Sequence, residues 1–406
     1  MNNRGRRPEV FIFESEAKAV LGAAESFARH GFRVVAGSSH RYCLGFYSRL
    51  VRERIIYPDE VARPQECVEF LLDLARKRRF DMILPLGDVV SQLVCSRRDE
   101  FMKYAKLVLV PYETFMIGRD KVQTMKAAEK CGVPIPRTYY PEEQSLDEIA
   151  RQVEYPVLVK PAVSNGARGI RYAHNKAELL ERYAEVAAEF GRTFVQEFVP
   201  HTGMQYKVEL LTDRDGSVLA SFAYAKIRFY PPTAGSSTLN LSLRHPEIVD
   251  YSVRMARSIG WYGMSDFDWI HDVRDGRPKL MEINPRVTDT IQIAQFCGLD
   301  FFRKLYQMAS GEKVEPQTTY RTGLYMRFLP GDILWFLTTK GPRFGLKPSW
   351  FRFFGSDLRY LVTSWSDPGP TIGYILDALQ AALDPQRRAF LFRMDRANRK
   401  PDRRQR

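Results

Sequence analysis

About the first hundred residues alternate short apolar runs with helical patterns, and this order restricts the possible folds more than any other feature. The apolar runs are EVFIFE (9–14), FRVVAGS (32–38), FDMILPL (80–86) and AKLVLVP (105–111), and helical patterns that end at Gly31 and begin after Pro64 lie between them. Such alternation predicts an open parallel sheet. The turn after the first run, ESEAKA, has no glycine triplet, so we expect no dinucleotide site of the Rossmann type.

The composition indicates a globular chain rather than a membrane-spanning or disulfide-rich one. Hydrophobic residues make up 45% of the 406, but no apolar run approaches the roughly 18–20 residues that a membrane span needs. The five cysteines are scattered without a CxxC pair, which argues against a disulfide framework and against a structural zinc site. The N-terminus MNNRGRRPEV lacks the apolar core of a secretory signal, so we expect a cytoplasmic location.

The pattern changes near Gly118, where a second kind of domain is expected to begin. The expected elements are a helix from Asp120 to Gly132, strands in YPVLVKPAV (155–163) and TFVQEFVP (193–200), hairpins at the RDG turns 214–216 and 274–276, and helices near 246–259 and in PRVTDTIQIAQFCG (285–298). This body should end near residue 315.

The stretch LMEINPRVTDT (280–290) places an acid, an amide and a guanidinium at alternate positions: Glu282, Asn284 and Arg286. Side chains at i and i+2 of a strand share a face, and oxygen donors of this kind suit Mg²⁺, with Mn²⁺ as a substitute. Asp266 and Asp268 share a face of the preceding strand, and the hairpin would place Asp268 across from Glu282. For Glu282 alone, the alternative is an acid at a strand edge that pairs with Arg286.

The stretch VLVKPAVSNGARGI (157–170) places Lys160 at the end of an apolar strand, before a loop that holds Ser164, Gly166 and Gly169. Glycines let backbone N–H groups surround phosphate oxygens, and a lysine supplies a point charge. The chain has no GxxxxGK[ST] motif, so this is not a Walker A loop. The alternative is an ordinary turn.

Three further segments have both a functional and a structural interpretation. FVQEFVP (194–200) would offer main-chain groups to adenine, or it would be a core strand. Lys121 in GRDK starts a helix, where anions are favoured, or it would simply be solvated. KIRFYPPTAGSSTLN (226–240) begins with KIRF at the end of a strand-like run, and a Pro/Gly/Ser stretch that reads as a loop follows. Its Lys226 and Arg228 suit an anionic substrate or a phosphate, or the segment would be a plain surface loop.

Taken in order, the segments GRDK…GVPIPRT, YPVLVKP, SNGARGI, VQEFVP, SDFDW and LMEINPR resemble the ATP-grasp superfamily over roughly 118–310. Within it, the chain looks like the stand-alone bacterial carboxylate–amine ligases, which are related to the carbamoyl-phosphate synthase large subunit, biotin carboxylase and D-alanine–D-alanine ligase. The resemblance implies an α/β chain, with an α+β grasp. The implied parts are an N-terminal parallel-sheet domain (1–117), a small lid subdomain (118–204), a metal and catalytic subdomain (205–315) and a C-terminal extension with a basic tail (316–406).

The resemblance also implies roles for individual residues. Lys121 and Lys160 would contact ATP phosphates under the loop 164–169, while Glu197 and Val199 would present main-chain groups to adenine near Gln196. The remaining roles are Mg²⁺ ligands for Asp268, Glu282 and Asn284 and phosphoryl stabilisation for Arg286. Lys226 and Arg228 are added as catalytic candidates from their own sequence pattern. Two positions depart from the family: Gln205 stands where an acid often binds the ribose, and Asp268 replaces a longer Glu that would reach two ions more readily.

The implied reaction is ATP-driven ligation, in which a carboxylate becomes an acyl phosphate and an amine then displaces phosphate. The substrates would be small molecules, with an amino acid as one candidate, and a homodimer is a further expectation. The alternatives are a non-catalytic ATP-binding sensor or assembly protein and, ranked last, a nucleic-acid-binding protein.

The net charge of +13 is concentrated in part at the C-terminus, where RMDRANRKPDRRQR (393–406) is strongly basic. Such a tail would attract anionic lipid or nucleic acid, or it would be a solvated terminus that aids solubility; we favour the second. Residues 316–406 would cover the site, form a dimer interface or approach a membrane surface.

Overall fold

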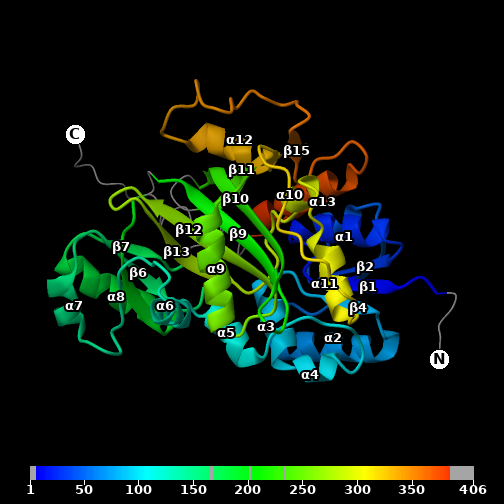
Figure 1. The fold of residues 1–406 in the computed structure, drawn as a ribbon, viewed down its shortest axis with the longest axis horizontal. Coiled ribbons are helices and arrows are strands. Elements are labelled where there is room, and N and C mark those ends of the chain that lie inside the picture. The colour runs from blue at the N-terminus through cyan, green and yellow to red at the C-terminus, as the bar shows by residue number, and fades with distance from the viewer. Residues whose placement is uncertain (1–5, 165–167, 201–202, 232–234, 385–406) are drawn as a thin grey trace.

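The computed structural model describes residues 6–164, 168–200, 203–231 and 235–384. Gly166 and the basic tail lie outside these ranges. Within them, no helix is both long and apolar enough to cross a membrane. Figure 1 shows the N-terminal domain on the right in blue, a small sheet with its helices on the left, and a large sheet between them.

The N-terminal domain contains the predicted parallel sheet, with strand order β3-β2-β1-β4. Its elements are β1 (Glu9–Ile12), α1 (Ala19–Arg29), β2 (Arg33–Ser38), the 3₁₀ turn η1 (Leu44–Tyr47), β3 (Val51–Ile56), α2 (Pro64–Arg78), β4 (Met82–Leu84), α3 (Asp88–Ser96) and α4 (Arg98–Phe101). One prediction is wrong: AKLVLVP forms no strand and makes only an isolated bridge from Lys106 to Met82. The run is apolar because it passes between two cores, with Leu107 packed in one and Val110 in the other.

The small sheet is antiparallel, in the order β5-β8-β6-β7. It comprises β5 (Thr138–Tyr139), β6 (Val157–Pro161), β7 (Arg171–Ala173) and β8 (Thr193–Glu197), with α7 (Leu146–Gln152) and α8 (Lys176–Phe190). The helices α5 (Tyr112–Arg119) and α6 (Lys121–Lys130) lead into it, and the Asp120 carboxylate caps α6 by accepting from Val122 N and Gln123 N, as an N-terminal capping residue does.

The large sheet has the order β13-β12-β9-β10-β11-β14-β15. Its strands are β9 (Gln205–Thr212), β10 (Val218–Tyr230), β11 (Ser236–Leu243), β12 (Gly263–Asp272), β13 (Arg277–Asn284), β14 (Tyr325–Arg327) and β15 (Leu358–Tyr360), and α9 (Pro246–Ser258) packs on it. Both hairpins predicted at the RDG turns are confirmed, joining β9 to β10 and β12 to β13. The last two strands come from the residues predicted as a C-terminal extension.

Two further predictions are wrong in their local structure. The strand-like run that ends in KIRF is confirmed as part of β10, but the loop predicted after it is too long, because β11 begins at Ser236 and pairs with the end of β10. The expected helix over 285–298 shrinks to α10 (Gln292–Phe296), followed by α11 (Phe301–Ala309). The residues before it are held by side chains instead: Asp289 accepts from both Lys18 N and Lys18 Nζ, and Thr290 Oγ1 lies 2.5 Å from the Tyr224 hydroxyl.

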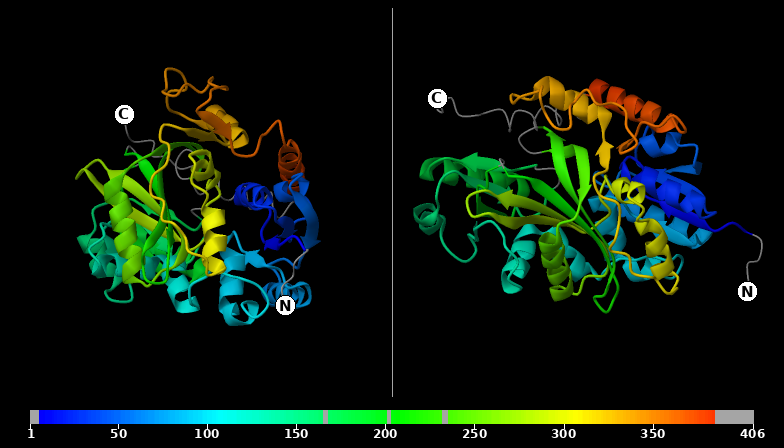
Figure 2. Two further views of the ribbon diagram at one scale, coloured as in Figure 1. Left: turned by 45° about the vertical axis from the view of Figure 1, so that its right-hand side comes forward. Right: turned by 45° about the horizontal axis from the view of Figure 1, so that its top comes forward.

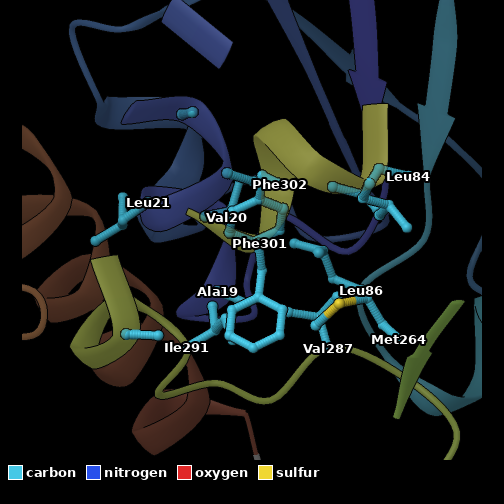
Figure 3. Close-up of a cluster of buried hydrophobic side chains, with 14 of the residues drawn as sticks. Ala19, Val20, Leu21, Leu84, Leu86, Met264, Val287, Ile291, Phe301 and Phe302 are labelled. Atoms are coloured by element: carbon cyan, nitrogen blue, oxygen red, sulfur yellow. The ribbon is translucent and has the colours of Figure 1, made fainter. Parts of the chain in front are cut away.

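A shared core fixes the N-terminal domain against the large sheet. Figure 3 shows Phe301 and Phe302 of α11 among Val20 of α1, Leu84 of β4 and Met264 of β12, all buried. The C-terminal helices α12 (Leu329–Thr338) and α13 (Gly369–Leu383) lie along the upper edge in the right-hand view of Figure 2. Because apolar burial is continuous across the boundary, the two parts hold one relative position.

Candidate active site

Polar side chains from four adjacent strands share one face of the large sheet. Asp268 lies opposite Glu282 on β13 and opposite Lys207 on β9, which confirms the predicted placement of Asp268 across from Glu282. Directly opposed residues project to the same side, and side chains alternate along each strand. The resulting polar face consists of Gln205, Lys207, Glu209, Tyr224, Lys226, Asp266, Asp268, Glu282 and Asn284.

The ammonium group of Lys207 lies between the two aspartates of β12. Its Nζ is 2.9 Å from Asp268 Oδ2, and it also donates to Asp266 Oδ2. Asp266 is fully buried. Burial acts to lower the pKa of Lys207, but Asp266 and then Asp268 raise it well above its ordinary value. A fixed cation therefore occupies the space between these carboxylates.

Asn284 and Arg286 link the polar face to the N-terminal domain. Asn284 Nδ2 donates to Asp266 Oδ2 at 3.0 Å and to Asp268 Oδ2 at 3.2 Å, and Asn284 Oδ1 accepts from Arg286 at 3.3 Å. Arg286 Nε lies 3.1 Å from the Asp88 carboxylate at the start of α3. The guanidinium is thus held beside the predicted metal ligands by an acid from a different domain.

Glu209 is a buried carboxyl group beside Asp266. Burial raises the pKa of Glu209 well above its ordinary value, with Asp266 adding to the effect and Lys207 opposing it. Its Oε1 lies 3.5 Å from the Tyr224 hydroxyl, and its Oε2 has no hydrogen-bond partner among the described residues. This environment favours the neutral carboxyl.

Lys121 and Lys160 bring the small sheet to the edge of the polar face. Lys121 Nζ lies 3.4 Å from Glu282 Oε2 and donates to Ser164 O at 3.1 Å. Lys160 Nζ donates to Gln196 Oε1 at 2.6 Å. Burial lowers the pKa of Lys160 to about 8, and Glu282 acts in the opposite direction. The structure therefore brings these five predicted residues into one neighbourhood.

The segment predicted to bind adenine lies at the end of β8. The main-chain N of Glu197 donates to Arg137 O at 2.9 Å, while its carboxylate accepts from Lys279 at 2.9 Å. Val199 is buried. The contacts of the Glu197 carboxylate explain why an acid is present here, and the main-chain contacts to adenine stay a prediction.

The loop after β6 contains one glycine with a clear conformational requirement. Gly169 has φ +80°, and a Cβ there would lie 2.8 Å from the Phe190 ring and 2.9 Å from Pro161 Cγ. Both the left-handed backbone and the close approach require glycine. The corresponding prediction for Gly166 falls outside the described residues.

Lys226 and Arg228 separate, although both were predicted to contact substrate. Lys226 Nζ lies 4.0 Å from Asp268 Oδ1, and burial lowers the pKa of Lys226. A β-bulge follows Lys226, and Arg228 instead pairs with Asp332 of α12 at 2.7 and 2.9 Å. The structure thus places Lys226 on the polar face and Arg228 in a buried ion pair.

The predicted metal ligands fit an ion that takes its remaining coordination positions from phosphate oxygens and water. They contribute two carboxylates and one amide oxygen, and the side chain of Glu282 is 34% exposed. Within the described ranges no group of three or more His, Cys, Asp and Glu residues could hold a metal by itself. Mg²⁺ commonly takes one or two carboxylates plus phosphate oxygens and water, so this donor set suits it.

Three residues of the site were not predicted from the sequence: Lys207, Glu209 and Asp88. YKVELLTD (206–213) carried a signal for the first two, because charged residues alternate with apolar ones along a buried strand. Asp88 carried no local signal, since its contact with Arg286 joins distant parts of the chain.

A model of a known protein family matches the central part of the chain. Residues 120–317 match the family model described as the ATP binding domain of the carbamoyl-phosphate synthase L chain. Residues 120–317 therefore form an ATP-binding domain of the ATP-grasp type, and the expected fold class and ATP-binding domain are confirmed.

Three relatives show the extent of the likeness. Biotin carboxylase from Pseudomonas aeruginosa is 25% identical over 50% of this chain, which spans only 48% of that protein. D-Aspartate ligase from Enterococcus faecium is 24% identical, covering 75% of this chain and 77% of the ligase. The biotin carboxylase domain dimer of Hydrogenobacter thermophilus 2-oxoglutarate carboxylase, solved with MgADP, ADP and bicarbonate, has a TM-score of 0.65 at 19% identity, covering 79% and 74% of the two chains.

Proposed function

We propose that this protein is an ATP-dependent ligase that joins a carboxylate to an amine and releases ADP and phosphate. The observation that carries the proposal is the 3.4 Å approach of Lys121 to Glu282, with the buried Lys160 beside them. Phosphoryl transfer depends mainly on positioning and charge neutralisation, and cations next to oxygen ligands supply both.

ATP is proposed to bind between the small sheet and the polar face. Lys121 and Lys160 would hold its phosphates, and the loop 164–169 would cover them. The adenine and ribose contacts are assigned to main-chain groups of Glu197 and Val199 and to the side chains of Gln196 and Gln205.

Asp268, Glu282 and Asn284 are the proposed ligands of Mg²⁺, which Mn²⁺ would replace. When bound, the ion would neutralise charge on the phosphate oxygens. Around it, Lys207 and Asn284 hold the carboxylates of β12 in position, and Asp88 holds Arg286.

In the proposed reaction, a substrate carboxylate oxygen attacks the γ-phosphorus, and the bond to the ADP oxygen breaks. The amine nitrogen then attacks the acyl carbon, phosphate leaves, and the amine loses a proton. Arg286 and Lys226 would neutralise the negative charge on the transferring group. An acyl phosphate hydrolyses in water, so closing the loop 164–169 over the site would protect it.

The substrates are proposed to be small molecules, and an amino acid is the candidate for one of them. One relative is a D-aspartate ligase, and this supports an amino acid as a substrate. A homodimer is proposed from the dimeric state of the 2-oxoglutarate carboxylase domain.

The test incubates the protein with Mg-ATP and pooled carboxylic acids, amino acids and amines. Two results are measured: the release of ADP, and the appearance of an amide product by mass spectrometry. Glu282→Gln is expected to abolish turnover without unfolding the chain, whereas Glu312→Gln, at an exposed acid away from the polar face, should leave turnover unchanged. Undiminished turnover of Glu282→Gln would contradict the assignment. ATP binding without ADP release on any acid–amine pair would indicate a non-catalytic sensor.

A further inference from the structure

Two carboxylate oxygens on the polar face are already saturated by nitrogen donors. Asp268 Oδ2 forms an ion pair with Lys207 Nζ at 2.9 Å and accepts from Asn284 at 3.2 Å. Asp266 Oδ2 accepts from the same two side chains, from Asn284 at 3.0 Å. A carboxylate oxygen has two lone-pair sites, so neither Oδ2 atom has one left for a metal.

The two neighbouring strands of the sheet fix the position of Lys207. Its backbone lies directly opposite Asp268 on one side and Tyr224 on the other, and its side chain is only 12% exposed. Strands on both sides therefore hold its ammonium in place, and moving it would leave the fully buried Asp266 without its cation.

Among the described residues, the carboxylate oxygens without a hydrogen-bond donor differ in exposure. Asp266 Oδ1 belongs to a fully buried residue, whereas two positions lie on the outer side of the cluster: Asp268 Oδ1, which has Lys226 Nζ at 4.0 Å, and the carboxylate of Glu282, the most exposed of the three acids. A second divalent ion bound at Asp268 Oδ2 would have to displace Lys207 and Asn284, and an ion beside them would face repulsion from the Lys207 ammonium.

We propose that Lys207 is a positioning residue that takes the place of a second metal ion, so that the site binds a single Mg²⁺. This inference rests on the metal site of the proposed function. The ion would use the oxygens that Lys207 leaves open, and the lysine would supply the remaining positive charge permanently.

The experiment counts Mn²⁺ ions bound per full-length chain by electron paramagnetic resonance, with a non-hydrolysable ATP analogue present. The wild-type chain is expected to bind a single ion, and Lys207→Met is expected to double the bound Mn²⁺. Lys207→Arg retains a cation and should keep the wild-type value. A lysine with a purely structural role would leave the Mn²⁺ count unchanged in all three proteins.

A second variant keeps the inference testable if Lys207→Met does not fold. Lys207→Met leaves the buried Asp266 unpaired, so the double variant Lys207→Met/Asp266→Asn removes both charges while still freeing Asp268 Oδ2. It too should bind a second ion. Equal Mn²⁺ counts in the wild type and the folded variants would overturn the inference for Lys207 alone. Absence of Mn²⁺ from every protein would overturn the metal site as well.

Discussion

Lys121 Nζ lies 3.4 Å from Glu282 Oε2, so the first helix after the N-terminal domain touches the strand that carries the proposed metal ligands. The same ammonium donates to Ser164 O at the start of the loop after β6. Helix, loop and metal strand therefore meet at one cation. Under the proposed function, a phosphate group bound at Lys121 would compete directly with the Glu282 carboxylate and with Ser164 O.

The KM for ATP should rise as the pH passes about 8. Burial lowers the pKa of Lys160 to about that value, so the protonated fraction that attracts phosphate falls above it. In Lys160→Arg the charge persists, and the KM should stay flat over the same range. Steady-state kinetics on both proteins measure this, and a flat wild-type profile would contradict the role of Lys160.

Glu209→Gln should make the free energy of unfolding less dependent on pH. Burial raises the pKa of Glu209 above its ordinary 4.5 in the folded state, so the folded chain binds more protons there than the unfolded chain. Wild-type stability from this group is present below 4.5 and is lost as pH rises through the folded pKa. Urea unfolding at several pH values should show that the free energy of unfolding of the variant increases relative to that of the wild type as pH rises. Parallel curves would refute the buried, neutral carboxyl.

The β12–β13 hairpin shows what local sequence determines. A turn signal at RDG, with polar residues at alternate positions on both sides, was sufficient to place Asp268 opposite Glu282. Strand periodicity and turn chemistry depend on only a few neighbouring residues, so they can be recognised in the sequence without knowledge of the rest of the fold.

Arg228 and AKLVLVP show where local reasoning fails. A β-bulge redirects Arg228 toward Asp332, 104 residues away in sequence, and nothing near Arg228 identifies that partner. AKLVLVP has the composition of a strand, yet it connects two cores. Both outcomes depend on distant packing, as does the contact of Arg286 with Asp88.

Asp332→Ala should destabilise the fold by about 3–5 kcal/mol, since it leaves buried cations without their counter-charge. The Asp332 carboxylate accepts from Arg228 at 2.7 and 2.9 Å and from Arg327 at 2.6 Å, and all three residues are buried. Chemical denaturation measures the loss, with Asp250→Ala at an exposed site as the control. A loss no larger than that of the control would show that this cluster contributes little.

Gly169→Ala should raise the KM for ATP and destabilise the chain more than Gly31→Ala does. Both glycines have positive φ, +80° and +83°, so alanine is strained at each position. Only at Gly169 would the new Cβ meet a ring carbon of Phe190 at 2.8 Å, whereas nothing lies within 4 Å at Gly31. The difference between the two variants therefore isolates the close packing under the loop 164–169. Thermal unfolding and ATP kinetics measure it, and identical behaviour of the two variants would show that this packing does not hold the loop.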